Sequence, residues 1–551
     1  MSLWIRNAVI ATMDRKNPAA ESAVVIGGFF AYVGTEKGAR DFLKDHPQKN
    51  VEELDCGGAF LMPGFNDSHL HFLHYAKAKM GSVDLRGTKS VGDVVERMKQ
   101  GLKNYNPASG LWLVGEGWNH DYFTDEKRYP TAADLDQVTT QYPVMVMRTC
   151  FHIGVLNSKA MELMKIDARA AEKMGDFAGK NPDGTPDGVF KEHIIDNIKA
   201  NLPAPDLKTL LEMVLTCQDD LFAQGITSIQ SDDFKYTPDG CAYDMMRLLR
   251  DASEDGRLKV RWGEQALLPT KAELDQFFDE KGWDDSFGNR SFKISTVKLL
   301  TDGSLGARTA YMRRPYADDP STRGLPTYTQ EELDALVLKA HENNMAVAMH
   351  AIGDGAMEMA LNAIEHARTA MPYLHPRHGI VHCQITDRRQ VKRFKELDVI
   401  AFIQPIFIDY DMHIVFDRVG RELGSTSYAW KDYIDSGVHA PFGTDAPVEN
   451  FNPMRGLYCA VTSRDLNGEG PFLPQQILSR EQALYGYTAA GAWATRDEDV
   501  KGMIKSGMYA DFITVDRNLL TCPERDIITA RVTSTYIGGS KVFRAFFEPA
   551  E

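Results

Sequence analysis

Eight short apolar runs, spaced along the middle of the 551-residue chain, constrain the fold more than any other feature. Most of them precede a helical pattern, at intervals of about 30–65 residues that hold one strand, one helix and their loops. Eight such units predict an α/β fold, a (β/α)8 TIM barrel, whose functional side chains gather at the carboxyl ends of the strands. The runs are Ala59–Phe65, Ile226–Ile229, Val260–Ala266, Ile294–Leu300, Ala346–His350, Gly379–His382, Val399–Ile403 and His439–Gly443.

The two ends of the chain differ from this middle part, because both consist of short β-branched runs with glycine turns. Chain termini of a domain often lie close together, so we expect residues 1–60 and 500–551 to form one composite β-sandwich domain. The barrel then spans residues 61–499. About 150 residues separate the first two apolar runs, which is too long for one crossover. This length predicts an insertion after the first barrel strand, a lid for substrate specificity over residues 111–200.

Composition excludes several classes of protein. The net charge of −15 argues against a nucleic-acid partner, since such proteins displace phosphate counterions with their own cations. No stretch approaches the ~20 apolar residues of a membrane span, and the N-terminus has no signal-peptide pattern. Seven scattered cysteines without a CxxC pair fit reduced thiols. We expect a cytoplasmic protein with a small-molecule substrate and no membrane partner.

His69 and His71 follow the first apolar run. Residues i and i+2 of a strand point to the same face, so both imidazoles converge on one point. Two neutral imidazoles suit a transition-metal ion. By itself the pair is a weak signal, because an isolated pair of this kind is more often two polar residues that leave a strand.

Further potential ligands end other strands of the predicted barrel. His350 ends the fifth run, His382 ends the sixth, and Asp445 follows the eighth. The carboxyl ends of barrel strands face one another across the mouth, so these side chains should meet the first two histidines. Imidazole and carboxylate together suit Zn, Fe, Mn or Ni. The pattern therefore predicts a metal centre.

Lys298 lies inside the apolar fourth run, where a buried ammonium group needs a compensating interaction. One interpretation is a salt bridge with a nearby carboxylate such as Asp302. The other is a reaction of the neutral amine with carbon dioxide, which makes an anionic carbamate with two oxygens that could bridge two metal ions. The residues alone leave both interpretations open.

The whole set resembles the amidohydrolase superfamily, specifically its amidohydrolase family 3 branch. That branch includes N-substituted formamide deformylases, YtcJ-like proteins and exoenzyme-regulatory proteins. The resemblance extends over essentially the whole chain. The motifs that carry it are Met62-Pro-Gly-Phe-Asn-Asp-Ser-His-Leu-His, Gly115-Glu-Gly-Trp-Asn, Lys298-Leu-Leu-Thr-Asp-Gly-Ser, His350-Ala-Ile-Gly-Asp, His382 and Gly443-Thr-Asp-Ala-Pro-Val.

The resemblance implies two divalent metal ions that carboxylated Lys298 bridges. Zn²⁺ is the first choice of metal for both ions, and other divalent metals are possible. It assigns His69, His71 and Asp445 to the more buried ion, and His350 and His382 to the second ion.

The implied activity is hydrolysis of a carbon–nitrogen bond other than a peptide bond, in an amide, formamide or cyclic amide, by attack of a metal-bound hydroxide. Asp445 would be the catalytic residue that accepts the proton of the water and passes it to the leaving nitrogen. One alternative is a mononuclear-metal deaminase, although such enzymes lack the bridging lysine. The alternative from another class is a non-catalytic regulatory or binding protein on the same scaffold.

Three further residues are candidates for substrate binding. Trp118 offers an aromatic pocket wall, and His152 could orient a substrate or merely cap a strand. Arg308 could hold a substrate carboxylate in a forked geometry or form a surface salt bridge. The oligomeric state stays open, with a homo-oligomer among the options.

Overall fold

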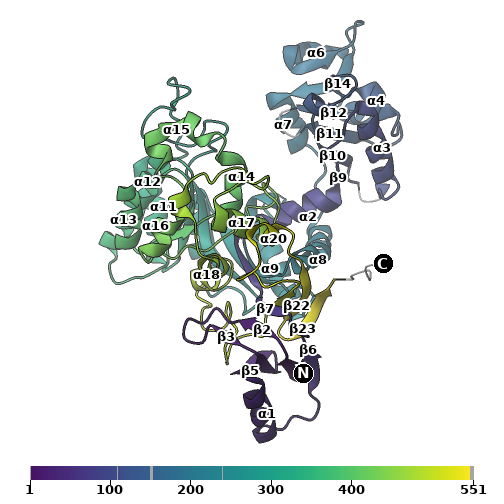
Figure 1. The fold of residues 1–551 in the computed structure, drawn as a ribbon. Helices are drawn as coiled ribbons and strands as arrows, with labels where there is room; N and C mark the ends of the chain where they lie inside the picture. Colours follow the sequence, from purple (N-terminus) through teal and green to yellow (C-terminus); the bar gives the residue numbers. More distant parts are fainter. Residues whose placement is uncertain (1, 108–109, 149–152, 239, 546–551) are drawn as a thin grey trace. The chain divides into compact units, whose positions relative to one another are not determined.

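The computed structural model describes residues 2–107, 110–148, 153–238 and 240–545 (Figure 1). The chain divides into two compact units, which are described separately. The first unit comprises Met1–Phe72, Leu215–Tyr236 and Ala242–Glu551, and the second comprises Leu73–Val214 and Thr237–Cys241.

A parallel sheet of seven strands forms the centre of the first unit, in the order β20-β19-β18-β17-β16-β15-β8. Helices pack on its outer face, and α11, α12, α13 and α16 lie side by side there (Figure 1). The strands are β8 (Phe65–Leu70), β15 (Ile226–Ser231), β16 (Arg261–Leu267), β17 (Phe292–Leu300), β18 (Val347–Ala351), β19 (Gly379–His382) and β20 (Ile400–Phe402). The helices after the strands include α9 (Ala242–Glu254), α10 (Lys271–Asp275), α11 (Gln330–Glu342), α12 (Asp354–Ala370), α13 (Arg388–Glu396), α16 (Trp430–Asp435) and α17 (Pro453–Thr462).

The segment around Phe442 closes the barrel between its two edge strands. The amide of Gly443 donates to the carbonyl of Ile403 at 2.9 Å, and the amide of Ser68 donates to the carbonyl of Phe442 at 2.9 Å. This segment is the eighth predicted run, although it forms only one isolated bridge instead of a regular strand. The (β/α)8 barrel is confirmed.

The first barrel strand is β8, so the prediction that Ala59–Phe65 forms it is wrong. β7 (Phe60–Pro63) pairs with strands from both ends of the chain, and the barrel begins only after Gly64. A side chain at Gly64 would meet the Thr227 side chain at 2.2 Å, which explains why the chain passes between the two sheets at a glycine. His69 consequently lies inside a strand.

Strands from the two termini share one sheet, in the order β23-β22-β21-β7-β2-β3, and a second sheet has the order β5-β4-β1-β6. Leu3, Val25, Leu61 and Phe512, from both termini, are members of one buried cluster. The fold class therefore includes a composite β-sandwich from both ends of the chain. The strands are β1 (Ser2–Arg6), β2 (Val9–Ala11), β3 (Ala19–Ala20), β4 (Ser22–Ile26), β5 (Phe29–Gly34), β6 (Glu52–Asp55), β21 (Phe512–Val515), β22 (Val532–Ile537) and β23 (Ser540–Arg544).

The second unit consists mainly of an insertion between β8 and β15, with a six-stranded mixed sheet of its own in the order β13-β14-β12-β11-β10-β9. Its strands are β9 (Ser82–Asp84), β10 (Leu113–Trp118), β11 (Val144–Arg148), β12 (Ile153–Leu156), β13 (Ala178–Lys180) and β14 (Pro186–Lys191). β9 pairs with β10, so residues 82–84, which precede the predicted start of the insertion at residue 111, already belong to this sheet. The predicted residue boundaries of the three domains stay a prediction. Among the described residues, no helix is long and apolar enough to cross a membrane.

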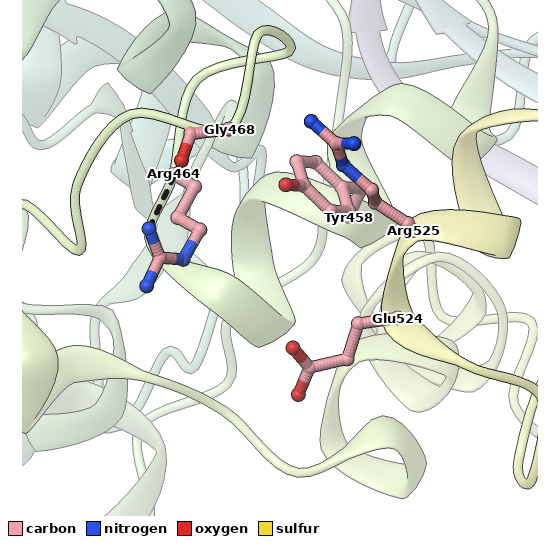
Figure 2. Close-up of a pocket in the computed structure, with 5 residues that line it drawn as sticks. All are labelled: Tyr458, Arg464, Gly468, Glu524 and Arg525. Carbon is pink, nitrogen blue, oxygen red and sulfur yellow. Dashed lines mark hydrogen bonds between the residues drawn. The ribbon is translucent and has the colours of Figure 1, made fainter.

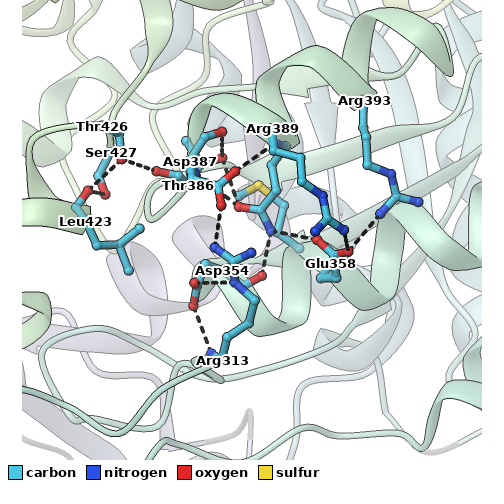
Figure 3. A network of polar contacts seen from close by, with 12 residues as sticks. Arg313, Asp354, Glu358, Thr386, Asp387, Arg389, Arg393, Leu423, Thr426 and Ser427 are labelled. Atoms are coloured by element: carbon cyan, nitrogen blue, oxygen red, sulfur yellow. Dashed lines mark hydrogen bonds and ion pairs between the residues drawn. The ribbon is translucent and has the colours of Figure 1, made fainter.

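A partly buried ionic network fixes the loops that follow three consecutive barrel strands (Figure 3). Arg313, in the loop after β17, donates to Asp354 at 2.6 Å and to Asp387 at 2.6 Å. Asp354 begins α12, directly after β18, and Asp387 caps α13, directly after β19. The network therefore holds together the ends of the three strands that carry Lys298, His350 and His382.

Candidate metal centre

His69, His71 and Asp445 meet at the carboxyl end of β8, where all three side chains are buried. Asp445 Oδ1 lies 3.3 Å from His69 Nε2 and 3.2 Å from His71 Nε2. One ligand atom of each residue lies within 4.8 Å of the other two. These separations fit three ligands of a single ion.

The backbone around Asp67 places this group. Asp67 is fully buried, and its carboxylate accepts hydrogen bonds from the amides of His69 at 3.2 Å and Thr444 at 3.1 Å. The amide of Asp445 in turn donates to the carbonyl of His69 at 2.8 Å. Burial raises the pKa of Asp67 to about 7. Hydrogen bonds thus join β8 to the closing segment at the point where both carry predicted metal ligands.

His350 and His382 complete a cluster of four imidazoles from the carboxyl ends of β8, β18 and β19. The ring centroids of His350 and His382 lie 4.5 Å apart, and those of His69 and His382 lie 5.7 Å apart. His382 and Asp445 have φ angles of 80° and 60°, a region that side chains other than glycine rarely adopt. Strain of this kind often marks functional sites.

Each of the four imidazoles hydrogen-bonds an oxygen atom through Nδ1. Carbonyl and carboxylate oxygens only accept hydrogen bonds, so Nδ1 carries the proton and Nε2 keeps its lone pair. Histidines that bind metals are typically oriented in this way. The pairs are His69 with Gln265 Oε1 (3.0 Å), His71 with the Asp232 carbonyl (2.8 Å), His350 with Asp302 Oδ1 (2.9 Å) and His382 with Gln404 Oε1 (2.9 Å).

Sequence reasoning missed these oxygen partners. Gln265 lies within β16, Asp232 directly follows β15, and Gln404 follows β20. The signal that could have found them is a polar residue at or just beyond the end of an otherwise apolar strand. Asp302 is a different case, because the sequence suggested it as a partner of Lys298, whereas it bonds to His350.

Lys298 lies against the cluster and is 1% exposed. Its Nζ is 3.2 Å from His69 Nε2, and its nearest carboxylate is Asp232 Oδ2 at 3.9 Å. Burial lowers the pKa of Lys298 to about 8, although Asp232 and Asp445 oppose this shift. Part of the population therefore carries a neutral amine near neutral pH, the form that reacts with carbon dioxide.

The protonation states of the other groups also suit a cation site. Burial lowers the pKa of His69 to about 4 and the pKa of His382 well below its usual value, so both rings are neutral. Burial acts to raise the pKa of Asp445, but the close contacts with His69 and His71 hold that pKa well below its usual value. Burial also acts to lower the pKa of His71, but the neighbouring Asp445 carboxylate raises it above its usual value. A metal ion at Nε2 of His71 would compete with a proton for the same lone pair, because divalent transition metals need neutral imidazoles and a carboxylate. The residues present fit such an ion.

Comparison with known proteins agrees with this geometry. A family model described as "Amidohydrolase family" matches residues 52–543. The chain belongs to this family. YtcJ of Bacillus subtilis is 28% identical over 98% of this chain and 99% of its own length, and N-substituted formamide deformylase of Arthrobacter pascens is 25% identical over 98% and 97%. An uncharacterized metal-dependent hydrolase from Pyrococcus horikoshii superposes with a TM-score of 0.78 at 28% identity, over 95% of this chain and 99% of that one.

The three predicted substrate-binding residues of this amidohydrolase have different surroundings. Arg308 makes a forked ion pair with Asp318, at 3.1 and 2.8 Å, as the surface salt-bridge interpretation predicts. Trp118 is fully buried in the second unit, where its ring lies 5.9 Å from that of Tyr129. His152 lies outside the described residues. The role of these three residues in substrate binding stays a prediction.

A cavity of about 450 Å³ lies elsewhere in the first unit, between α17 and the C-terminal helix α20 (Glu524–Ile528) (Figure 2). Arg464 donates from one side of it to the carbonyls of Gly468 and Gly470. The lining residues are Tyr458, Arg464, Gly468, Glu524 and Arg525. None of the six predicted metal ligands is among them, so the cavity is not the candidate metal centre.

Proposed function

We propose that this amidohydrolase is a metal-dependent hydrolase that cleaves the carbon–nitrogen bond of a small amide, formamide or cyclic amide. The observation that carries the proposal is the cluster of four oriented imidazoles and Asp445 around one buried lysine. The likeness to N-substituted formamide deformylase, across nearly the whole length of both chains, supports the choice of substrate class.

The ligands divide into two sets around Lys298. His69, His71 and Asp445 would hold one divalent ion, taken as Zn²⁺, and His350 and His382 would hold the second. When bound, such ions polarise a substrate carbonyl and lower the pKa of water. Lys298 would link the two sets as a carbamate: its neutral Nζ attacks the carbon of CO2, a C=O bond opens to an anionic oxygen, and the amine proton leaves to solvent.

The contacts and charge of Asp445 support a role in proton transfer. Its Oδ1 faces the Nε2 atoms of His69 and His71, and its low pKa keeps the carboxylate ionised at neutral pH. We assign it the acceptance of a proton from the attacking water and the delivery of that proton to the leaving nitrogen. An amine is a poor leaving group unless it is protonated, so this delivery completes bond cleavage.

The test is a hydrolysis screen of the full chain, demetallated and then reconstituted with Zn²⁺ and bicarbonate. The panel contains N-acyl amines, formamides, N-acyl amino acids and cyclic amides, with a ring amidine as the deaminase control. Release of amine and carboxylic acid by the reconstituted protein alone is the expected result.

Two results would overturn the proposal. Turnover of the amidine with about one ion per chain, unaffected by Lys298→Met, would instead identify a mononuclear deaminase. Absence of turnover on the whole panel, with the metal fully bound, would favour a binding or regulatory protein on the same scaffold.

A further inference from the structure

Asp232 carries a buried carboxylate that stands out by its lack of hydrogen bonds among the described residues. It directly follows β15, and its side chain is fully buried. Neither Oδ1 nor Oδ2 has a hydrogen-bond partner in the part of the chain that the structure describes. Lys298 Nζ and His71 Nδ1 each lie 3.9 Å from Oδ2, beyond hydrogen-bond distance. Its backbone carbonyl, in contrast, accepts the hydrogen bond from His71 Nδ1.

Such a residue is unfavourable for folding alone. A buried charge is costly unless it is paired and hydrogen-bonded, and most buried carboxylates accept several hydrogen bonds. The neighbouring Glu264 follows this rule, because it accepts from the amide of Asp233 at 2.9 Å and from Trp262 Nε1 at 2.9 Å. Asp232 is therefore a candidate for a functional charge.

We infer that Asp232 is a positioning residue that supplies a fixed negative charge beside the metal centre and strengthens cation binding there. The inference rests on the proposed function, which requires divalent ions at this centre. Asp232 would act through His71 and through the field of its charge, since it lies on the Nδ1 side of His71 and cannot reach the ion that Nε2 faces. Its charge would favour the imidazole orientation of His71 that ligation needs.

Charge counting supports this role. One divalent ion with Asp445 and an ammonium at Lys298 leaves two excess positive charges in a buried site. Two ions with Asp445 and a carbamate at Lys298 leave the same excess. In either state Asp232 removes one of these charges, and charge is weakly screened in a buried environment. A hydrogen-bonded carboxylate would contribute less, because its donors would already balance part of its charge.

The experiment compares Asp232→Asn with Glu264→Gln in the full-length, metal-free protein. Zn²⁺ affinity is measured by competition with a chelator, and the melting temperature of the metal-free form is measured separately. Asp232→Asn removes a charge without changing shape. Glu264→Gln is the matched control, because burial raises the pKa of Glu264 well above its usual value and its substitution changes hydrogen bonds more than charge.

We expect Asp232→Asn to weaken Zn²⁺ binding by about 10- to 100-fold. The melting temperature of the metal-free form should stay unchanged or rise, because no hydrogen bond is lost. Glu264→Gln should lower that temperature and leave Zn²⁺ affinity nearly unchanged. Wild-type affinity in Asp232→Asn, or failure of this variant to fold, overturns the inference. A wild-type protein that binds no Zn²⁺ would refute the proposed function instead, so the two failures are distinguishable.

Discussion

Replacement of Asp302 by Asn tests how the structure prepares His350 for a metal. The Asp302 side chain is fully buried, and each of its oxygens accepts two hydrogen bonds. Oδ1 accepts from His350 Nδ1 at 2.9 Å and from the amide of Ile352 at 3.1 Å. Oδ2 accepts from the amides of Gly353 at 2.8 Å and Tyr311 at 3.0 Å. An asparagine can satisfy only one of these two pairs of donors.

The expected loss of stability and of metal affinity follows from the two orientations that the side-chain amide of the Asp302→Asn variant can take. If the amide oxygen stays toward His350, the NH2 group faces the Gly353 and Tyr311 amides and leaves two buried donors unpaired, at about 1–3 kcal/mol each. The free energy of unfolding should then fall by about 2–6 kcal/mol. If the amide flips, the NH2 group faces His350 Nδ1 and the imidazole loses its fixed tautomer. In both orientations the carboxylate no longer increases the basicity of His350, so metal affinity should fall about 10- to 100-fold.

The assay combines metal content after dialysis against a chelator with urea unfolding of the metal-free protein. Asp497→Asn is the matched control for destabilisation alone. Asp497 forms ion pairs with Lys293 Nζ at 2.7 Å and Lys501 Nζ at 3.0 Å. Lys293 lies near the start of β17, at the opposite end of that strand from Lys298. This control should unfold more easily and bind metal normally. Wild-type metal content in Asp302→Asn would refute the assigned role of Asp302.

Three other predictions follow from the same geometry. Asp445→Asn should lower kcat by about 10²- to 10⁴-fold while metal content is largely kept. Steady-state kinetics and metal analysis of the same sample measure both quantities. Full activity of this variant would contradict the role of Asp445 in proton transfer. The proposed carbamate forms from the neutral amine of Lys298, whose pKa is about 8. Equilibrium uptake of labelled bicarbonate should therefore rise about tenfold per pH unit below pH 8 and level off above it; a pH-independent uptake would exclude the carbamate. His378 is buried, and its Nδ1 accepts a hydrogen bond from the amide of Val347 at 3.1 Å. Burial lowers the pKa of His378 well below its usual value, so the unfolded chain binds a proton that the folded protein excludes. The contribution of His378 to the free energy of unfolding should therefore be complete above about pH 6.5 and fall by up to ~1.4 kcal/mol per pH unit below it. His378→Gln should flatten this slope in urea titrations; an unchanged slope would show that other groups cause it.

The sequence by itself determined the barrel, the composite sandwich of both termini and the six residues proposed as metal ligands. The physical reason is periodicity, because the carboxyl ends of parallel strands must share one edge of a barrel. Polar residues at those ends, such as His350 and His382, are therefore neighbours in space although they are far apart in the chain. The first strand was misplaced because the apolar residues Phe60–Pro63 belong to the terminal sheet, whereas the barrel strand Phe65–Leu70 is mostly polar and does not look like a buried strand in the sequence.

Only the tertiary structure decided how the ligands are oriented and charged. The hydrogen bonds of the four imidazoles with Gln265, Asp232, Asp302 and Gln404 join residues from different strands, and no local pattern specifies such pairs. Only the packing of the strands likewise shows that Asp232, and not Asp302, lies beside Lys298. A sequence shows which groups can bind a metal, whereas burial and distances between strands decide which groups are neutral, oriented and unpaired.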